Sequence, residues 1–196
     1  MDRILALDLL KRKVNNINLI KHCLSVEAIM REIAGDLNVR GFSIDGTCRK
    51  FDEDKWAVTG LLHDIDYEET ANDPLNHSLV SEKILKEEGF DDEIIYAVKA
   101  HNDLHGLPLK SEMDIALFSC DPVSGLIVAS ALIKPEKSLS AIDADFILNR
   151  YREKSFAKGA NRNTMLFSEK LGYDLLGFFE ISLRAMNKIS KELGLY

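Results

Sequence analysis

The sequence has little cysteine and no long hydrophobic run. Its three cysteines, Cys23, Cys48 and Cys120, have neither paired nor CxxC spacing, which argues against a disulfide framework and favours a reducing compartment. The longest apolar stretch, residues 125–133, is far shorter than the ~20 residues that a membrane span needs. The first residues also lack the apolar core of a signal peptide. We therefore expect a soluble, cytoplasmic protein with no membrane partner.

Positive charge is also scarce. The chain carries 25 lysines and arginines against 32 acidic residues, a net charge of -7. This balance argues against a nucleic acid polymer as partner, because such binding needs a broad basic face. An anionic small molecule remains compatible, since a bound metal supplies local positive charge. With 196 residues, 46% of them hydrophobic, the chain suits a single domain over residues 1–196 with a sizeable core.

No run of alternating apolar and polar residues is long enough to form a sheet, and helical spacing dominates instead. The expected fold class is all-α. Between residues 36 and 51 the chain is irregular, with a tight turn at Asp45-Gly46, and Gly35 is the expected stop of the helix before it. The expected helices cover residues 2–12, 19–34 (capped by Asn18), Asp52 through the His63-Asp64 pair, 73–89, 91–101, 111–132, 141–154, 161–171 and 174–193.

Histidine and aspartate, two common metal-ligand types, recur at helix ends or inside apolar helices. A buried helix has no structural use for a histidine followed at once by an aspartate, because desolvating both is costly. Taken alone, His63-Asp64 is equally well explained as a satisfied core histidine beside a helix end. The recurrence favours a metal site with mixed nitrogen and oxygen ligands instead. The set contains four of the five histidines: His22, His63, Asp64, His77, His101 and Asp121.

These residues, in the order H…HD…H…H…D, resemble the signature of the HD-domain superfamily of metal-dependent phosphohydrolases. The resemblance covers about residues 18–135 and implies an HD-domain helical bundle. The remainder, about 136–196, looks like the extra C-terminal helices of a small bacterial HDIG-type subgroup. One departure matters: Ile65-Asp66-Tyr67 follows the HD pair where HD-GYP phosphodiesterases have glycine and lysine, and no GYP motif occurs later. Specificity for cyclic dinucleotides is therefore not carried over.

The resemblance implies roles for the individual residues. His22, His63, Asp64 and Asp121 would hold one metal. In a two-metal arrangement Asp64 bridges, with His77 and His101 on the second ion; alternatively these two histidines contact substrate phosphate. Asp64 and His63 form the catalytic centre, where a metal-activated water attacks phosphorus. The cofactor is one or two divalent ions of Mn, Fe, Co, Ni, Mg or Zn, and Asp66 is expected to orient a histidine.

Cations near the site would clamp the substrate phosphate. Residues 154–160 form a cationic loop, and its segment 154–159, which ends in glycine, resembles a phosphate-receiving loop in composition. Each cation taken singly is better explained as a solvated surface group, so the phosphate-binding hypothesis concerns them as a set. Trp56 and Phe118 are expected in the core, and His105 is expected to face solvent. The candidate substrate-binding residues are Lys134, Lys154, Lys158 and Arg162.

The sequence thus predicts a divalent-metal-dependent phosphohydrolase, either a phosphomonoesterase or a phosphodiesterase, whose substrate is a phosphorylated small molecule and specifically a nucleotide. Two other classes stay open. Some HD proteins with the longer ligand set hold a mixed-valent di-iron centre and oxidise carbon substrates with O₂. A non-catalytic regulatory module that binds a nucleotide is the other. The chain is expected to be a monomer or a homodimer.

Overall fold

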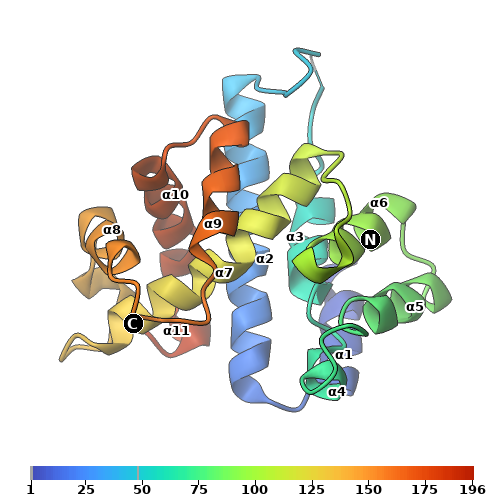
Figure 1. Cartoon of the computed structure of the whole chain (residues 1–196), viewed down its shortest axis with the longest axis horizontal. Coiled ribbons are helices and arrows are strands. Elements are labelled where there is room, and N and C mark those ends of the chain that lie inside the picture. Colours follow the sequence, from blue (N-terminus) through green and yellow to red (C-terminus); the bar gives the residue numbers. More distant parts are fainter. Residues whose placement is uncertain (1, 48) are drawn as a thin grey trace.

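The computed structural model of the chain describes residues 2–47 and 49–196, and over these ranges it contains helices and turns but no strand. The all-α prediction is confirmed (Figure 1). The tight turn expected at Asp45-Gly46 is present, with the Gly46 amide donating to the Ser43 carbonyl at 3.2 Å. Cys48 lies outside the described residues.

Helix α2 (Ile17–Arg40) runs through the middle of the molecule and packs against α3 (Glu53–Leu62), α7 (Glu112–Leu132) and α10 (Leu175–Lys188) (Figure 1). The Asn16 side chain caps its start, and Gly41, at φ 59°, ends it. The predicted cap at Asn18 and stop at Gly35 were therefore wrong. A glycine inside a helix costs only about 1 kcal/mol, and buried Leu37 continues the apolar face beyond it.

Two hydrophobic clusters lie on either side of α2. The first joins α2 to the helices before residue 100, and Leu10, Leu61 and Ile94 are buried at its centre. The Asp52 side chain caps α3, as expected, and thereby fixes where the helix that leads to His63 begins. The other helices on this side are α1 (Arg3–Lys13), α4 (Tyr67–Thr70), α5 (Leu79–Glu87) and α6 (Asp92–Ala100).

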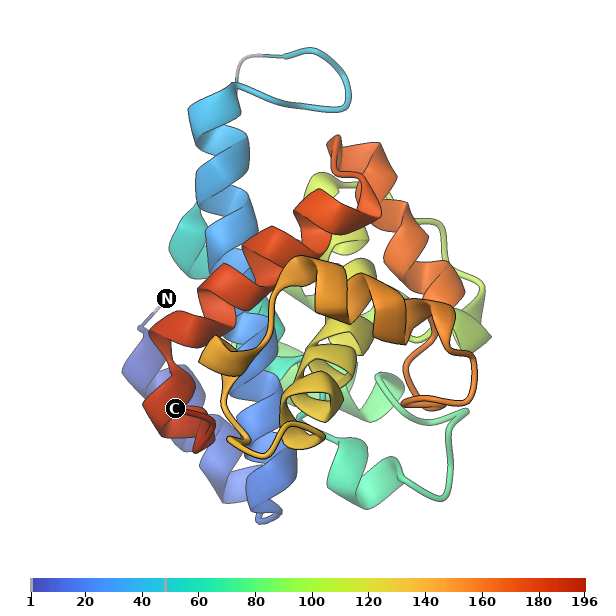
Figure 2. The ribbon, with the colours of Figure 1, turned by 90° about the vertical axis from the view of Figure 1, so that its left-hand side faces the viewer.

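The second cluster joins α2 and α7 to the C-terminal helices, with Phe178 and Phe179 of α10 fully buried. Figure 2 shows α10 crossing obliquely over the upper part of α2. The helices predicted over residues 141–154, 161–171 and 174–193 are all present, the last two as pairs of shorter segments. These elements are η2 (Leu139–Ala141), α8 (Ala144–Arg152), α9 (Arg162–Met165), η3 (Leu166–Leu171), α10 and α11 (Ser190–Leu193).

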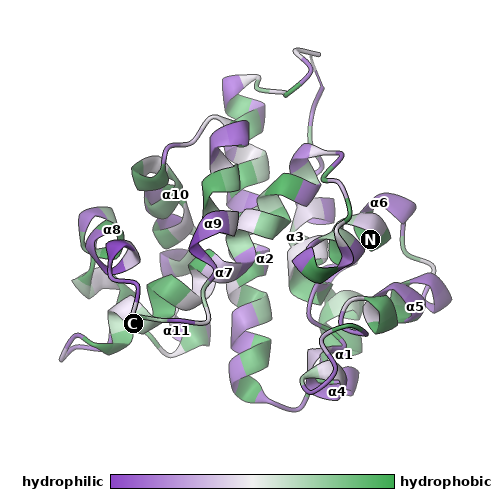
Figure 3. Ribbon diagram, viewed as in Figure 1, coloured by the Kyte–Doolittle hydropathy of each residue, from purple (hydrophilic) through white to green (hydrophobic). Residues whose placement is uncertain are grey.

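Helix α7 carries the most continuous apolar sequence of the described chain, as Figure 3 shows. Ser111 and Asp114 form the expected capping box at its start. The helix continues through Pro122. It is long and apolar enough to cross a membrane, but 67% of its most apolar window is buried in the bundle, which is the pattern of a core helix.

The start of α5 differs from the prediction. A helix was expected from Asp73-Pro74, but the chain forms turns up to Ser78, which has φ 67°, and α5 begins at Leu79. Both oxygens of the Asp66 carboxylate are used here. One accepts from the His77 ring, and the other accepts from the Ser78 and Ser81 amides. These bonds hold the turn in place of a longer helix, and they place His77 inward.

Candidate metal centre

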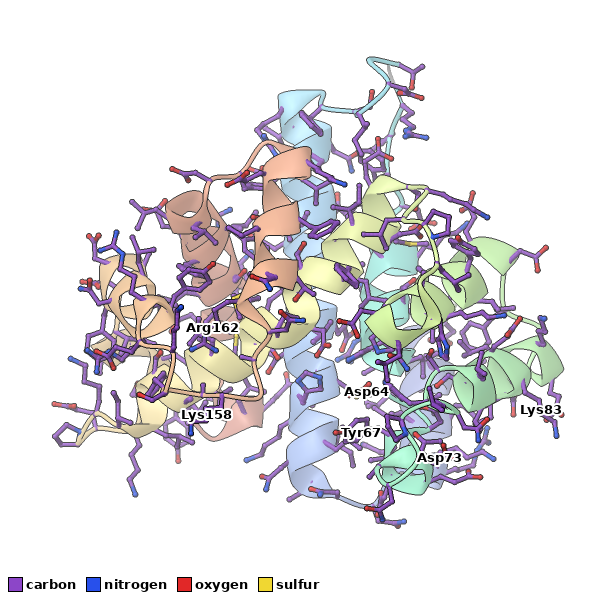
Figure 4. All side chains as sticks on the ribbon, in the orientation of Figure 1. Asp64, Tyr67, Asp73, Lys83, Lys158 and Arg162 are labelled. Atoms are coloured by element: carbon purple, nitrogen blue, oxygen red, sulfur yellow. The ribbon has the colours of Figure 1, made fainter. Side chains whose placement is uncertain are left out.

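The six predicted ligands come from five separate parts of the fold and meet at one point. His22 lies in the second turn of α2, and Asp121 lies midway along α7. His63 and His101 are the residues at which α3 and α6 end, and Asp64 follows His63. His77 lies in the turn before α5. In Figure 4 Asp64 and neighbouring Tyr67 lie close to the lower half of α2.

A first group of ligand atoms surrounds one oxygen of Asp64. The His22 Nε2 atom lies 3.1 Å from His63 Nε2 and 3.2 Å from Asp121 Oδ1. Asp64 Oδ2 lies 3.4 Å from the same His22 nitrogen and 3.5 Å from His63 Nε2. This arrangement brings together the four residues that the resemblance assigns to one metal.

A second group surrounds the other oxygen of the same carboxylate. Asp64 Oδ1 lies 3.4 Å from His77 Nε2 and 3.5 Å from His101 Nε2, and these two nitrogens are 3.2 Å apart. Sets of three ligand atoms within 4.8 Å of one another occur in both groups, with a third set, His63, His101 and Asp121, between them. Asp64 therefore stands between two neighbouring ligand groups.

The partners of the other ring nitrogens determine how these imidazoles can act. The Nδ1 atoms of His63 and His101 face the carbonyls of Gly60 and Val98, and His77 Nδ1 faces the Asp66 carboxylate. These oxygens only accept, so each Nδ1 carries the proton. His22 Nδ1 lies 2.9 Å from Ser124 Oγ.

The Ser124 hydroxyl donates to the Asp121 carbonyl and so accepts from His22. When the four rings are neutral, each therefore directs a bare Nε2 lone pair toward the same carboxylates. Four lone pairs and two carboxylates in contact repel one another unless a cation lies among them. Imidazole nitrogens and carboxylate oxygens together form a donor set that fits divalent transition metals.

The ionisation of the carboxylates also favours a bound cation at this site. Burial lowers the pKa of His22, but hydrogen bonds and charges of Asp121 and Asp64 outweigh it and raise the pKa to about 10. Burial raises the pKa of Asp64, but His63, His101 and His22 pull it well below its ordinary value. Burial also raises the pKa of Asp121, but His22 and His63 lower it below its ordinary value. Both carboxylates therefore remain ionised, and the site attracts positive charge, either a proton on His22 or a metal ion.

A cleft of about 230 Å³ opens onto the second ligand group. Tyr67, from α4, lies at its edge with its ring 5.2 Å from that of His77 and nearly perpendicular to it. Gly159 and Asn161 line the cleft from the loop before α9, so the predicted phosphate-receiving loop does reach the site. Phe118, expected in the core, is only half-buried and lines the cleft as well, whereas Trp56 is buried as expected.

The predicted substrate-binding cations lie in different surroundings. In Figure 4 Lys158 and Arg162 lie to the left of α2, whereas Asp64 lies to its right. The Arg162 guanidinium donates to the carbonyls of Phe156, Ala157 and Ala160, so it is engaged in shaping the loop. The Lys134 ammonium lies 4.0 Å from the centre of the Phe146 ring. Lys154 and Lys158 are exposed.

Several residues hold the histidines of the centre in place, although the sequence pattern does not single most of them out. Ser124 holds His22 across the α2–α7 contact, and Asn102 donates its amide to the Pro74 and His77 carbonyls. His105, expected to face solvent, instead donates to the His77 carbonyl at 2.8 Å. Asp66 orients His77 as expected. Only Asp66 was detectable, because it shares the turn of the HD pair; the others depend on which helices cross.

A larger cavity of about 530 Å³ lies between α3, α6 and the start of α7, away from the ligand groups. Three of its cations already have partners. Arg49 pairs with Glu112, and Lys55 pairs with Asp91 and Glu93. The Lys110 ammonium lies 3.9 Å from the centre of the Tyr96 ring. Candidate metal ligands line the smaller cleft and not this larger cavity.

Comparison with known proteins gives one family and one relative. The family model for the HD domain matches residues 19–145. An uncharacterised protein of Methanocaldococcus jannaschii is 30% identical over 96 residues, which is 49% of this chain and 51% of that protein. The match thus spans about half the length of the relative. No solved structure matches the chain significantly.

Proposed function

The chain belongs to the HD-domain family, and from this we propose that it is a divalent-metal-dependent phosphohydrolase whose substrate is a phosphorylated small molecule, a nucleotide. Proteins of this family are broadly metal-dependent hydrolases. One observation carries the proposal for this chain. Four Nε2 lone pairs and the carboxylates of Asp64 and Asp121 converge, with every opposite ring nitrogen committed to another partner.

We infer two metal positions that share the Asp64 carboxylate. His22, His63 and Asp121 would complete the first position, and His77 and His101 the second. When bound, such ions lower the pKa of a water to near neutrality and neutralise charge that builds on the phosphoryl oxygens. The ligand types admit Mn, Fe, Co, Ni, Mg or Zn.

The chain's own residues supply position and orientation. His63 is completely buried and Asp64 is 7% exposed, so both are held by packing and need little reorganisation during the reaction. Asp66, Ser124 and the Gly60 carbonyl keep three of the rings in one orientation. The narrow cleft beside Tyr67 and Asn161 admits a phosphoryl group to the second ligand group. Lys154 and Lys158 are proposed to attract the phosphate from the loop.

Phosphate release from a substrate panel tests this function. The protein, purified without chelator and supplied in turn with Mn²⁺, Mg²⁺, Zn²⁺ or Fe²⁺, is expected to release phosphate from nucleotides or other phosphate esters. His77→Ala should reduce kcat at least about a hundredfold if it removes one metal. The exposed Lys83→Ala on α5 is the matched control and should keep wild-type activity.

The outcome also separates the two rival functions. A shared carboxylate with histidines on both sides suits a di-iron centre as well. Uptake of O₂ by the iron-loaded protein, with no phosphate release from any substrate, would replace hydrolysis with oxygenation. Full metal occupancy with neither reaction would leave a nucleotide-binding module.

A further inference from the structure

A second cavity adjoins the cleft beside the metal centre. This cavity of about 380 Å³ shares two lining residues, Asp103 and Phe118, with the cleft. Phe118 precedes Asp121 by three residues on α7, and residues three apart lie on the same helix face. A group that rests on the Phe118 ring is thus directly beside a metal ligand.

The walls of the second cavity are mainly apolar and aromatic. Leu107, Pro108 and Leu109 form one side, and Phe167 of η3 forms another. The Phe118 and Phe167 rings meet edge to face, with centres 5.0 Å apart and planes at 71°. Both rings remain half-buried, so each keeps a face that the other does not cover. Such rings bind flat aromatic groups by stacking.

Two charged residues border the cavity. Asp103 lines both cavities, and its carboxylate lies 3.5 Å from the side-chain nitrogen of Asn161. The Lys170 ammonium lies 4.5 Å from the centre of the Phe167 ring, at the far side. A carboxylate beside the metal centre repels a second phosphate group but accepts hydrogen bonds from hydroxyl groups.

We propose that the cavity lined by Phe118 and Phe167 is the subsite for the leaving group, and that it selects phosphomonoesters whose leaving group carries a flat aromatic ring. A nucleoside monophosphate has this chemistry, with sugar hydroxyls near Asp103 and the base on Phe118. This inference rests on the proposed function, because it takes the phosphoryl group to lie at the metal centre. It excludes phosphosugars and nucleoside triphosphates as preferred substrates.

The test compares substrates that differ only in the aromatic ring. Four nucleoside 5′-monophosphates and ribose 5-phosphate are offered to the metal-loaded protein, and phosphate release is measured. The wild type should favour the best nucleotide over ribose 5-phosphate by at least about tenfold in kcat/KM, since stacking on an aromatic side chain contributes this much. Equal kcat/KM values for all five compounds would overturn the proposal.

Variants assign the preference to the cavity. Phe118→Leu and Phe167→Leu keep apolar volume but remove the rings, so each should lower kcat/KM for the nucleotides more than for ribose 5-phosphate and bring the ratio of the two values close to one. Phe51→Leu removes a half-buried ring that lines the separate larger cavity, and it should keep the preference. A preference that survives in both Phe118→Leu and Phe167→Leu would also overturn the proposal.

A binding measurement separates this inference from the proposed function. Adenosine has no phosphate, so calorimetry or saturation-transfer NMR reports its binding without any reaction. Binding to the wild type that is weakened at least about tenfold in both Phe118→Leu and Phe167→Leu supports the subsite even if no phosphate is ever released. Phosphate release without a nucleotide preference, and without adenosine binding, would keep the hydrolase and remove the subsite.

Discussion

The Asp66 carboxylate holds the candidate ligand His77 in place and is not itself one of the six candidate ligands. One oxygen lies 2.8 Å from His77 Nδ1, and the other accepts the amides of Ser78 and Ser81 at 2.8 and 2.9 Å. Burial raises the pKa of Asp66, but the hydrogen bond and charge of His77 outweigh burial and lower the pKa below its ordinary value, so the carboxylate stays ionised. The carboxylate thereby fixes both the tautomer and the direction of the His77 ring.

Asp66→Asn is therefore expected to weaken metal binding about 10- to 100-fold, which is the usual effect of losing such a partner. A competition titration with a chelating dye measures this change. Asp73→Asn is the matched control, because the Asp73 side chain accepts from Asn76 within the same turn, whereas Asp73 meets His77 through backbone atoms that the substitution keeps. Equal affinities of Asp66→Asn and the wild type would show that His77 is positioned by packing alone.

The sequence identified six candidate ligands that the structure brings together, because histidine and aspartate are rare in apolar helices. It did not identify Ser124, Asn102 or Tyr67. Ser124 is an ordinary serine of α7, and it meets His22 only because α2 crosses α7 there. The position of Phe118 at the cleft was missed for the same reason: its spacing fits a core residue, and its half-buried ring lies beside the loop and η3 residues that line the second cavity.

At the scale of the elements, the contact between α2 and α3 sets the distance between His22 and His63. Gly60 lies where the two helices meet, and a β-carbon there would stand 2.8 Å from the Val26 carbonyl oxygen. Such a contact forces the backbones apart. The Gly60 carbonyl also accepts the His63 Nδ1 proton, so a shift of α3 would directly move the candidate ligand His63.

Gly60→Ala is expected to lower the free energy of unfolding by about 1–3 kcal/mol, as overpacking does, and to weaken metal binding. Urea denaturation and the chelator titration measure the two effects. Gly35→Ala should instead raise stability by about 0.5–1 kcal/mol, because its β-carbon would meet only the Glu53 carboxylate, at the ordinary distance of 3.5 Å. A stable Gly60→Ala protein with full affinity would disprove this account of the helix contact.

The loop between α2 and α3 is joined to α7 by a buried carboxylate. Glu112 is 1% exposed and accepts from the Ile44 amide at 2.9 Å and from the Arg49 guanidinium at 2.6 Å. Burial raises the pKa of Glu112, but the Arg49 and Ile44 hydrogen bonds lower it more. Its folded pKa lies below the unfolded value, so the ionised form stabilises the fold at neutral pH.

Glu112→Gln should therefore cost about 1 kcal/mol at pH 7, a modest value because the Arg49 side chain is 45% exposed. The contribution is complete above the unfolded pKa, near 4.3, and is lost as the pH falls through the lower folded pKa. Denaturation curves of wild type and variant should thus converge in acid. The exposed Glu136→Gln is the control, and a difference that stays constant with pH would contradict the assignment.

At the scale of the whole molecule, the sequence predicted the class and most helices because periodicity and capping residues such as Asp52 and Ser111 are local signals. Boundaries set by distant contacts were missed. Gly35 lies within α2 since the apolar face continues to Leu37, and the turn at residues 71–78 replaces a helix because Asp66 binds it. The convergence of five segments on Asp64 follows from the family resemblance, and local pattern alone does not predict it.

Metal content per chain tests the central claim most directly. The wild-type protein, purified without chelator and without oxygen and measured by mass spectrometry, should hold about two divalent ions per chain. His77→Ala should retain one, and Asp64→Ala should retain none while its far-UV circular dichroism stays helical. A wild-type chain that holds no ion even after reconstitution, or an Asp64→Ala chain that keeps both, would contradict the account.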